Sequence, residues 1–138
     1  MQCVFVSSGL LKIDNIAAGV GVVIFSPASG VAVGMHILRA IPPSSTVSNP
    51  TYFAATAIPY AVAEIKKREM IPPFSVAIAG GGSMMPSTKG DVGEKMSTVV
   101  KKVLEKTGLA IKIEKTGGSR VRTIILNLDE GKINILHK

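Results

Sequence analysis

The chain has 138 residues, which fit one ordinary domain with a core of its own. It carries 16 Lys and Arg against 9 Asp and Glu, and 46% of its residues are hydrophobic. No run approaches the roughly 18 uninterrupted apolar residues that a membrane-spanning helix needs. The N-terminal segment alternates like a strand and lacks the basic region and cleavage site of a signal peptide. We therefore expect a single cytoplasmic domain over residues 1–138.

The net charge of +7 raises the question of a polyanionic partner. The basic side chains are spread over three predicted elements: Lys66, Lys67, Arg68, Lys95, Lys101, Lys102, Lys106, Arg120 and Arg122. Aromatic residues make up only 4% of the chain, so a basic face has few rings on which bases could stack. We expect solvated basic faces, and nucleic acid as a partner is disfavoured. Binding of an anionic ligand by Arg120 and Arg122 stays open as an alternative, which steep salt dependence would reveal.

Cysteine and histidine are scarce. The single cysteine, Cys3, cannot form an internal disulfide, and it is far in sequence from His36 and His137. The spacing therefore favours neither a metal cluster nor a cofactor site, and we expect neither.

The first half of the chain predicts strands followed by a helix. Short strands are expected at residues 4–8 and 10–13, broken at Gly9, and a strand buried on both faces at residues 20–25. Turn residues at 26–30 predict that residues 31–38 return as its hairpin partner, which places His36 across from the segment containing Gly19 and Gly21. Residues 39–50 form a predicted loop. An alanine-rich helix follows at residues 51–68, capped by Asn49 or Thr51, with Pro59 either kinking it or marking its start.

The second half predicts a strand, a helix and three more strands. A buried strand is expected at residues 74–79 and a helix at residues 92–107, with Asp91 as its cap and Gly108 as its C-terminal left-handed residue. The helix has apolar residues at spacings of three and four, which predicts a core stripe of Met96, Val99, Val100, Val103 and Leu104. Strands follow at residues 110–114, 120–128 and 132–136, the last two joined by a turn at residues 129–131.

Two glycine-rich segments end strands and are candidates for a site. The first, Gly80, Gly81, Gly82 and Ser83, lets a backbone or a ligand approach closely, and its N–H groups are either donors for an anion or carbonyl oxygen or part of a tight packing turn. The second is Thr116, Gly117, Gly118, Ser119 and Arg120, which is either a binding segment or a hairpin turn followed by outward-facing arginines. His36, taken alone, is compatible with a structural histidine or a catalytic one.

The order of these features is similar to that of the CheD family, the chemoreceptor glutamine deamidases of chemotaxis. The resemblance extends over residues 14–136, and its most specific parts are IAGGGSM at residues 78–84, similar to the family's IAGGASMF, and TGGSRVR at residues 116–122, similar to its TGGNRxR. It implies an α+β fold, a layered sandwich of two mixed sheets with helices packed on one side. It also implies that the two glycine turns converge near His36 and bind substrate.

The resemblance implies a Cys-His-Thr site in which a thiolate attacks a glutamine carboxamide, ammonia leaves, and water releases glutamate. His36 matches the family histidine. The family cysteine lies in a strand similar to residues 19–24, where we place Gly21 at the position of the nucleophile, and the family threonine falls on Asn15. Met96 stands approximately where the family has an asparagine. Glycine has no side chain, so a covalent route from that position is excluded.

Two hypotheses about function follow from this pattern. The first is a CheD-like chemotaxis protein that lacks thiol deamidase activity and binds protein partners, either chemoreceptor helices or a CheC-type phosphatase. The alternative is a divergent glutamine deamidase that uses Cys3 or a water activated by His36. The first needs no nucleophile, whereas the second requires Cys3 or an oxyanion site beside His36.

Overall fold

The computed structural model describes residues 3–38, 54–82 and 92–137 of the chain. Within these residues the chain forms strands and helices in the following order: β1 (Val4–Val6), β2 (Leu10–Ile16), β3 (Val20–Ser26), β4 (Val31–Ile37), α1 (Ala54–Lys67), β5 (Ser75–Gly80), α2 (Val92–Lys106), β6 (Ile111–Thr116), β7 (Arg122–Asn127) and β8 (Lys132–His137). No helix within these ranges is long and apolar enough to cross a membrane.

A five-stranded sheet forms the centre of the fold, in the order β1-β4-β3-β5-β6. The β5–β6 pair is parallel and the other pairs are antiparallel. Strand β3 lies in the middle and is buried along its whole length, because it has a strand on either side and a packed layer on each face. This explains why its sequence is apolar without alternation, as expected for a strand covered on both faces.

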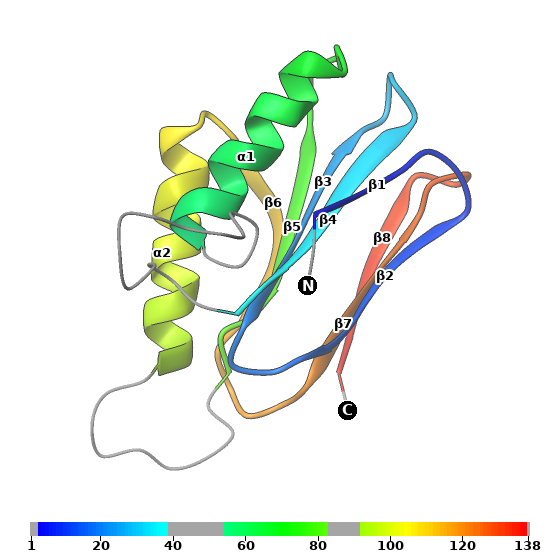
Figure 1. Cartoon of the computed structure of the whole chain (residues 1–138). Helices are drawn as coiled ribbons and strands as arrows, with labels where there is room; N and C mark the ends of the chain where they lie inside the picture. Colours follow the sequence, from blue (N-terminus) through cyan, green and yellow to red (C-terminus); the bar gives the residue numbers. More distant parts are fainter. Residues whose placement is uncertain (1–2, 39–53, 83–91, 138) are drawn as a thin grey trace.

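The helices and a second sheet cover opposite faces of the central sheet (Figure 1). On one face, α1 and α2 pack against residues of β3, β4 and β5, such as Val22, Met35 and Ile78. On the other face, the antiparallel three-stranded sheet β2-β7-β8 packs through residues such as Ile13 and Ile124. The fold is therefore a sandwich of three layers, with successive residues of β3 alternating between two separate cores.

These observations confirm the expected α+β class and the placement of both helices on one side. The structure corrects one detail, since only the five-stranded sheet is mixed and each neighbouring pair in the three-stranded sheet is antiparallel. Helix α1 begins at Ala54 and contains Pro59, so Pro59 does not mark its start. The predicted stripe of α2 is confirmed, with Met96, Val100 and Leu104 buried.

The hairpin prediction is also confirmed, since β3 and β4 pair with Gly21 directly opposite His36. Gly9 and Gly108 have the positive φ angles of 76° and 80° that the breaks at these positions require. The predicted loop at residues 39–50 and the caps Asn49, Thr51 and Asp91 lie outside the described residues, as does Ser83.

Candidate functional site

The candidate site lies at one end of the central sheet, where β3 begins and β4 and β5 end. The N–H of Gly81, just after β5, donates to the carbonyl of Gly19 at 2.9 Å, and the N–H of Gly117, just after β6, donates to the carbonyl of Gly80 at 3.0 Å. His36 is near the end of β4, one residue before Ile37. The fold therefore brings the two glycine turns and the end of β4 to the same edge, as the resemblance implied.

The geometry of β3 decides which of its residues faces His36. Gly21 lies in β3 and faces the three-stranded sheet, whereas Gly19 lies in the bend just before β3. A Cβ atom at Gly19 would lie 3.3 Å from Nε2 of His36. A Cβ atom at Gly21 would instead meet Cδ1 of Ile16 at 2.6 Å, with Ile124 and Ile13 as its next neighbours.

The three nearest neighbours of a Cβ atom at Gly21 are thus isoleucine atoms and not the imidazole, although Gly21 is the direct cross-strand partner of His36. The isoleucines of the second sheet fill the space above Gly21, and a thiol there would be buried among them. The position that faces Nε2 is Gly19, two residues earlier. The assignment of the nucleophile position to Gly21 stays a prediction, and neither Gly19 nor Gly21 has a side chain that could act as a nucleophile.

Asn15 does not reproduce the orienting role that the resemblance implies for a threonine. It lies in β2 at an irregularity between Ile13 and Ile16, has a φ of 55°, and is exposed. Its backbone N–H donates to Oδ1 of Asp14 at 3.0 Å. No hydrogen bond joins Asn15 to His36 within the described ranges, so the imidazole has no orienting partner from this residue.

Cys3 lies on the wrong face of the central sheet to act with His36. Its side chain packs with Phe5 against the core between the sheet and the helices, whereas His36 shares the opposite face with Gly21. Burial, with a smaller effect of the Glu64 carboxylate, raises the pKa of the Cys3 thiol to about 11. A thiol of that pKa is almost entirely protonated near neutral pH and is a poor nucleophile. The placement of Cys3 and the raised pKa of its thiol both disfavour a deamidase that uses Cys3.

The glycines after β5 form a packing turn. The N–H of Gly82 donates to the carbonyl of Ala17 at 3.0 Å, as that of Gly81 does to Gly19. A Cβ atom at Gly80 would lie 2.2 Å from the carbonyl oxygen of Gly19, and one at Gly81 would lie 2.8 Å from that of Gly93 in α2. The turn therefore requires glycine for close approach, and the N–H groups of Gly81 and Gly82 are already used by the main chain.

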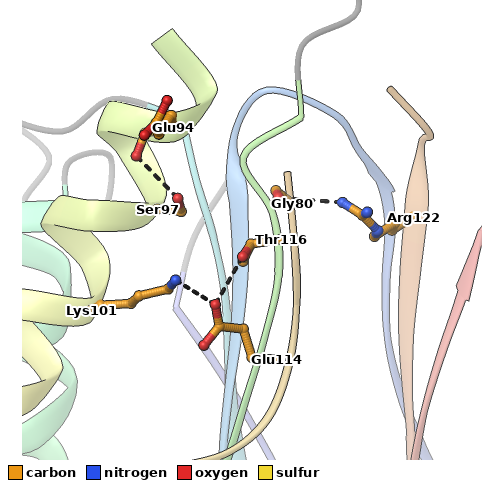
Figure 2. Close-up of polar contacts among 7 residues, drawn as sticks. All are labelled: Gly80, Glu94, Ser97, Lys101, Glu114, Thr116 and Arg122. Carbon is orange, nitrogen blue, oxygen red and sulfur yellow. Dashed lines mark hydrogen bonds and ion pairs between the residues drawn. The ribbon is translucent and has the colours of Figure 1, made fainter. Parts of the chain in front are cut away.

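Arg122 of the second sheet contacts both glycine turns, and Figure 2 shows its contact with Gly80. Its guanidinium donates from one nitrogen to the carbonyl of Gly117 at 2.7 Å and, more weakly, to that of Gly80 at 3.4 Å. The sequence left open whether the arginines of this segment bind substrate or face outward. Arg120 and Ser119 are exposed, whereas Arg122 is half-buried and acts within the protein. In the sequence, the only sign of the contact between Arg122 and the glycine carbonyls is the second arginine of the TGGSRVR segment, which is Arg122 itself.

Thr116 takes part in a polar network that ties β6 to α2 (Figure 2). Its hydroxyl donates to Oε2 of Glu114 at 2.9 Å, and the same oxygen forms an ion pair with Lys101 of α2. The hydrogen bond from Lys101 lowers the pKa of Glu114 below its ordinary value. The Thr116 hydroxyl is thus engaged by Glu114 and stabilises the strand that leads into the second glycine turn.

The imidazole of His36 is half-buried, and burial lowers its pKa below the ordinary 6.5. As the pH falls below about 6.5, the unfolded chain takes up a proton before the folded one, so the free energy of unfolding should decrease down to the folded pKa. We expect an NMR titration of His36 to give a midpoint below 6.5. Urea unfolding should show a smaller loss of stability over that window in His36→Gln than in the parent chain. A midpoint at or above the ordinary value would contradict the burial that the structure shows.

Comparison with known proteins places this chain in one class of proteins. Residues 39–137 match the family described as CheD, chemotactic sensory transduction. A probable chemoreceptor glutamine deamidase CheD of Desulforamulus reducens is 35% identical over 125 residues, which cover 84% of this chain and 74% of the relative. One from Caldanaerobacter subterraneus is 32% identical over 135 residues, covering 92% of this chain and 82% of the relative. The chemoreceptor glutamine deamidase CheD of Thermotoga maritima is 30% identical over 127 residues, covering 91% and 80%.

The chain therefore belongs to the CheD family and is a CheD-like chemotaxis protein. The family match begins at residue 39, beyond Gly19 and His36, so it carries no information about the nucleophile position. The chemistry possible at the nucleophile position is therefore argued from the contacts of Gly19, Gly21 and His36.

Proposed function

We propose that this chain is a protein-binding member of the CheD family that lacks thiol deamidase activity and acts in the cytoplasm. The observation that carries the proposal is the residue facing His36: the position directed at Nε2 is Gly19, which has no side chain. A covalent deamidation needs a thiolate within hydrogen-bond reach of the histidine that protonates the leaving nitrogen. The only cysteine of the chain, Cys3, faces the other core.

Close packing around Gly19 supports the same proposal. A Cβ atom there would lie 2.7 Å from the carbonyl oxygen of Ile37, closer than real Cβ contacts come. The carbonyl of Gly19 is also bound by the N–H of Gly81. Three strands thus meet at this point with backbone against backbone, and a side chain would fit only after β4 moved.

The alternative in which His36 activates water is weakened by the same contacts. Such a route would need donors beside the imidazole to stabilise an oxyanion. The N–H groups of Gly81, Gly82 and Gly117 all donate to main-chain carbonyls instead. His36 is left without these three groups as an oxyanion site.

The proposed partners are proteins. The relative from Thermotoga maritima is named for its action on chemoreceptors, and we propose that this chain binds chemoreceptor helices without converting their glutamines. A CheC-type phosphatase is the second partner that the family resemblance implies. Retention of the fold and of both glycine turns supports binding, because these features shape the edge of the sheet independently of a nucleophile.

The test is a deamidation assay on the cytoplasmic fragment of a chemoreceptor, read by mass spectrometry. We expect no conversion of glutamine to glutamate by this chain, under conditions where the Thermotoga maritima relative converts its own receptor fragment. Binding of the fragment is measured separately by calorimetry. Conversion that Cys3→Ala or His36→Ala abolishes would overturn the loss of activity, whereas absence of binding to both receptor and phosphatase would overturn the binding role.

A further inference from the structure

A hollow lies at the opposite end of the sandwich from Gly19. It is a hollow of about 360 Å³ between the end of β3, the beginnings of β5 and β6, and the turn that joins β7 to β8. Phe25 in its wall is six residue steps along the extended chain from Gly19, a distance of about 20 Å. The volume is at the lower end of the range for small-ligand sites, which suits a molecule of roughly the size of one amino acid.

The hollow combines an apolar wall with charges of both signs. Apolar side chains of both sheets contribute to the wall: Phe25, Ile113, Leu128 and Ile133. Lys112, Asp129 and Glu130 also line the hollow, and all three are exposed. None of the three forms an ion pair with another residue in the part of the chain that the structure describes. Their charges are thus available to a ligand.

The turn that carries the two carboxylates is held in place by its own hydrogen bonds. The N–H of Gly131 donates to the carbonyl of Asn127 at 2.7 Å, and the N–H of Glu130 donates to the side-chain oxygen of Asn127 at 3.1 Å. Gly131 has a φ of 70°, which favours glycine, and a Cβ atom there would lie 3.9 Å from the ring of Phe25. A fixed turn lowers the entropy that a ligand must overcome on binding.

We propose that this hollow binds a small zwitterion, an α-amino acid with an aliphatic or aromatic side chain. The side chain would contact Phe25 and Ile133, the α-carboxylate would pair with Lys112, and the α-ammonium would pair with Asp129 or Glu130. A purely apolar ligand would leave all three charges unused, and a ligand with a single charge would leave one sign unmatched. The site is independent of the proposed loss of deamidase activity, because it shares no residue with the glycine turns or with His36.

The experiment titrates the folded chain, labelled with ¹⁵N, with L-leucine and with two analogues that each lack one charge, 4-methylpentanoate and 3-methylbutylamine. Saturable shifts are expected at the amides of Ile113, Glu130 and Gly131 with leucine, and affinity should be about two- to fivefold weaker for each analogue, the effect of losing one exposed ion pair. No saturable shift with leucine, equal affinity for all three compounds, or shifts confined to the glycine turns would overturn the proposal.

Substitutions at Lys112, Asp129 and Glu130 test which side chain contacts the carboxylate of the ligand and which contacts its ammonium group. Lys112→Ala should weaken leucine binding without changing the affinity for 3-methylbutylamine, which has no carboxylate. The double variant Asp129→Asn and Glu130→Gln should do the reverse, leaving 4-methylpentanoate unaffected. Lys132→Ala is the matched control, because this exposed lysine of β8 does not line the hollow. An equal effect of Lys132→Ala on leucine affinity would show a general charge effect and would overturn the site.

Discussion

Gly80→Ala is expected to lower the free energy of unfolding by about 4 kcal/mol, because backbone strain and a backbone clash act together at this position. Gly80 has a φ of 119°, which L-amino acids rarely adopt and which costs on the order of 1–3 kcal/mol to impose. Its Cβ would in addition lie 2.2 Å from the carbonyl oxygen of Gly19, and packing against a backbone that must move adds about 1–3 kcal/mol. Urea unfolding followed by circular dichroism measures the change.

Gly108→Ala is the matched control for this substitution. Gly108 also has a positive φ, 80°, but no atom outside its chain neighbours lies within 4 Å of the Cβ position. Strain is therefore present without a clash, and we expect a loss of about 1 kcal/mol. Equal losses for the two variants would mean that close approach of β5 to β3 does not stabilise this edge of the sheet.

A thiol introduced at position 19 is expected to behave very differently from one introduced at position 21. In Gly19→Cys the sulfur would extend from a Cβ beside Nε2 of His36, and transfer of the thiol proton to this imidazole forms a thiolate–imidazolium pair, which lowers the pKa of the thiol. In Gly21→Cys the sulfur would be buried among Ile16, Ile124 and Ile13, which raises the pKa and blocks access. We expect alkylation by iodoacetamide to be at least about tenfold faster for Gly19→Cys, the effect of one pKa unit on the thiolate fraction.

The parent chain supplies the background rate of Cys3, whose pKa of about 11 makes it slow to react. The double variant Gly19→Cys, His36→Ala should lose most of the gain if the imidazole is responsible. Both single variants should be less stable than the parent, since each Cβ meets a neighbour at less than 3.0 Å. Faster alkylation of Gly21→Cys than of Gly19→Cys in folded protein would reverse the assignment of the position that faces His36.

Much of the site was predictable because its signals are local. Strands that run into glycines, a hairpin with turn residues at its centre and a histidine near its end indicate the elements and their order, and the structure confirms the pairing of Gly21 with His36. The positive φ angles of Gly80, Gly81, Gly117 and Gly118 agree with the choice of glycine at these turns.

The use of the glycine N–H groups was not predictable from the same residues. A run of glycines is equally suited to binding an anion and to close packing, and the partner of each N–H lies on another strand. Gly81 donates to Gly19, more than 60 residues away in sequence, and Arg122 reaches Gly80 and Gly117 from the other sheet. Secondary-structure propensity and hydrophobic periodicity depend on residues that are close in sequence. They therefore give no information about hydrogen bonds between residues that are far apart in the chain.

The sequence by itself determined the family pattern, the order of strands and helices, and the absence of a cysteine from residues 19–24. Only the tertiary structure decided that the imidazole is among the nearest neighbours of a Cβ atom at Gly19 and not of one at Gly21, and that Cys3 packs against the other core. The physical reason is that the space beside each glycine is filled by residues of other strands, on which the periodicity along β3 gives no information. Ile16 and Ile124 fill the space beside Gly21, and the imidazole of His36 lies beside Gly19.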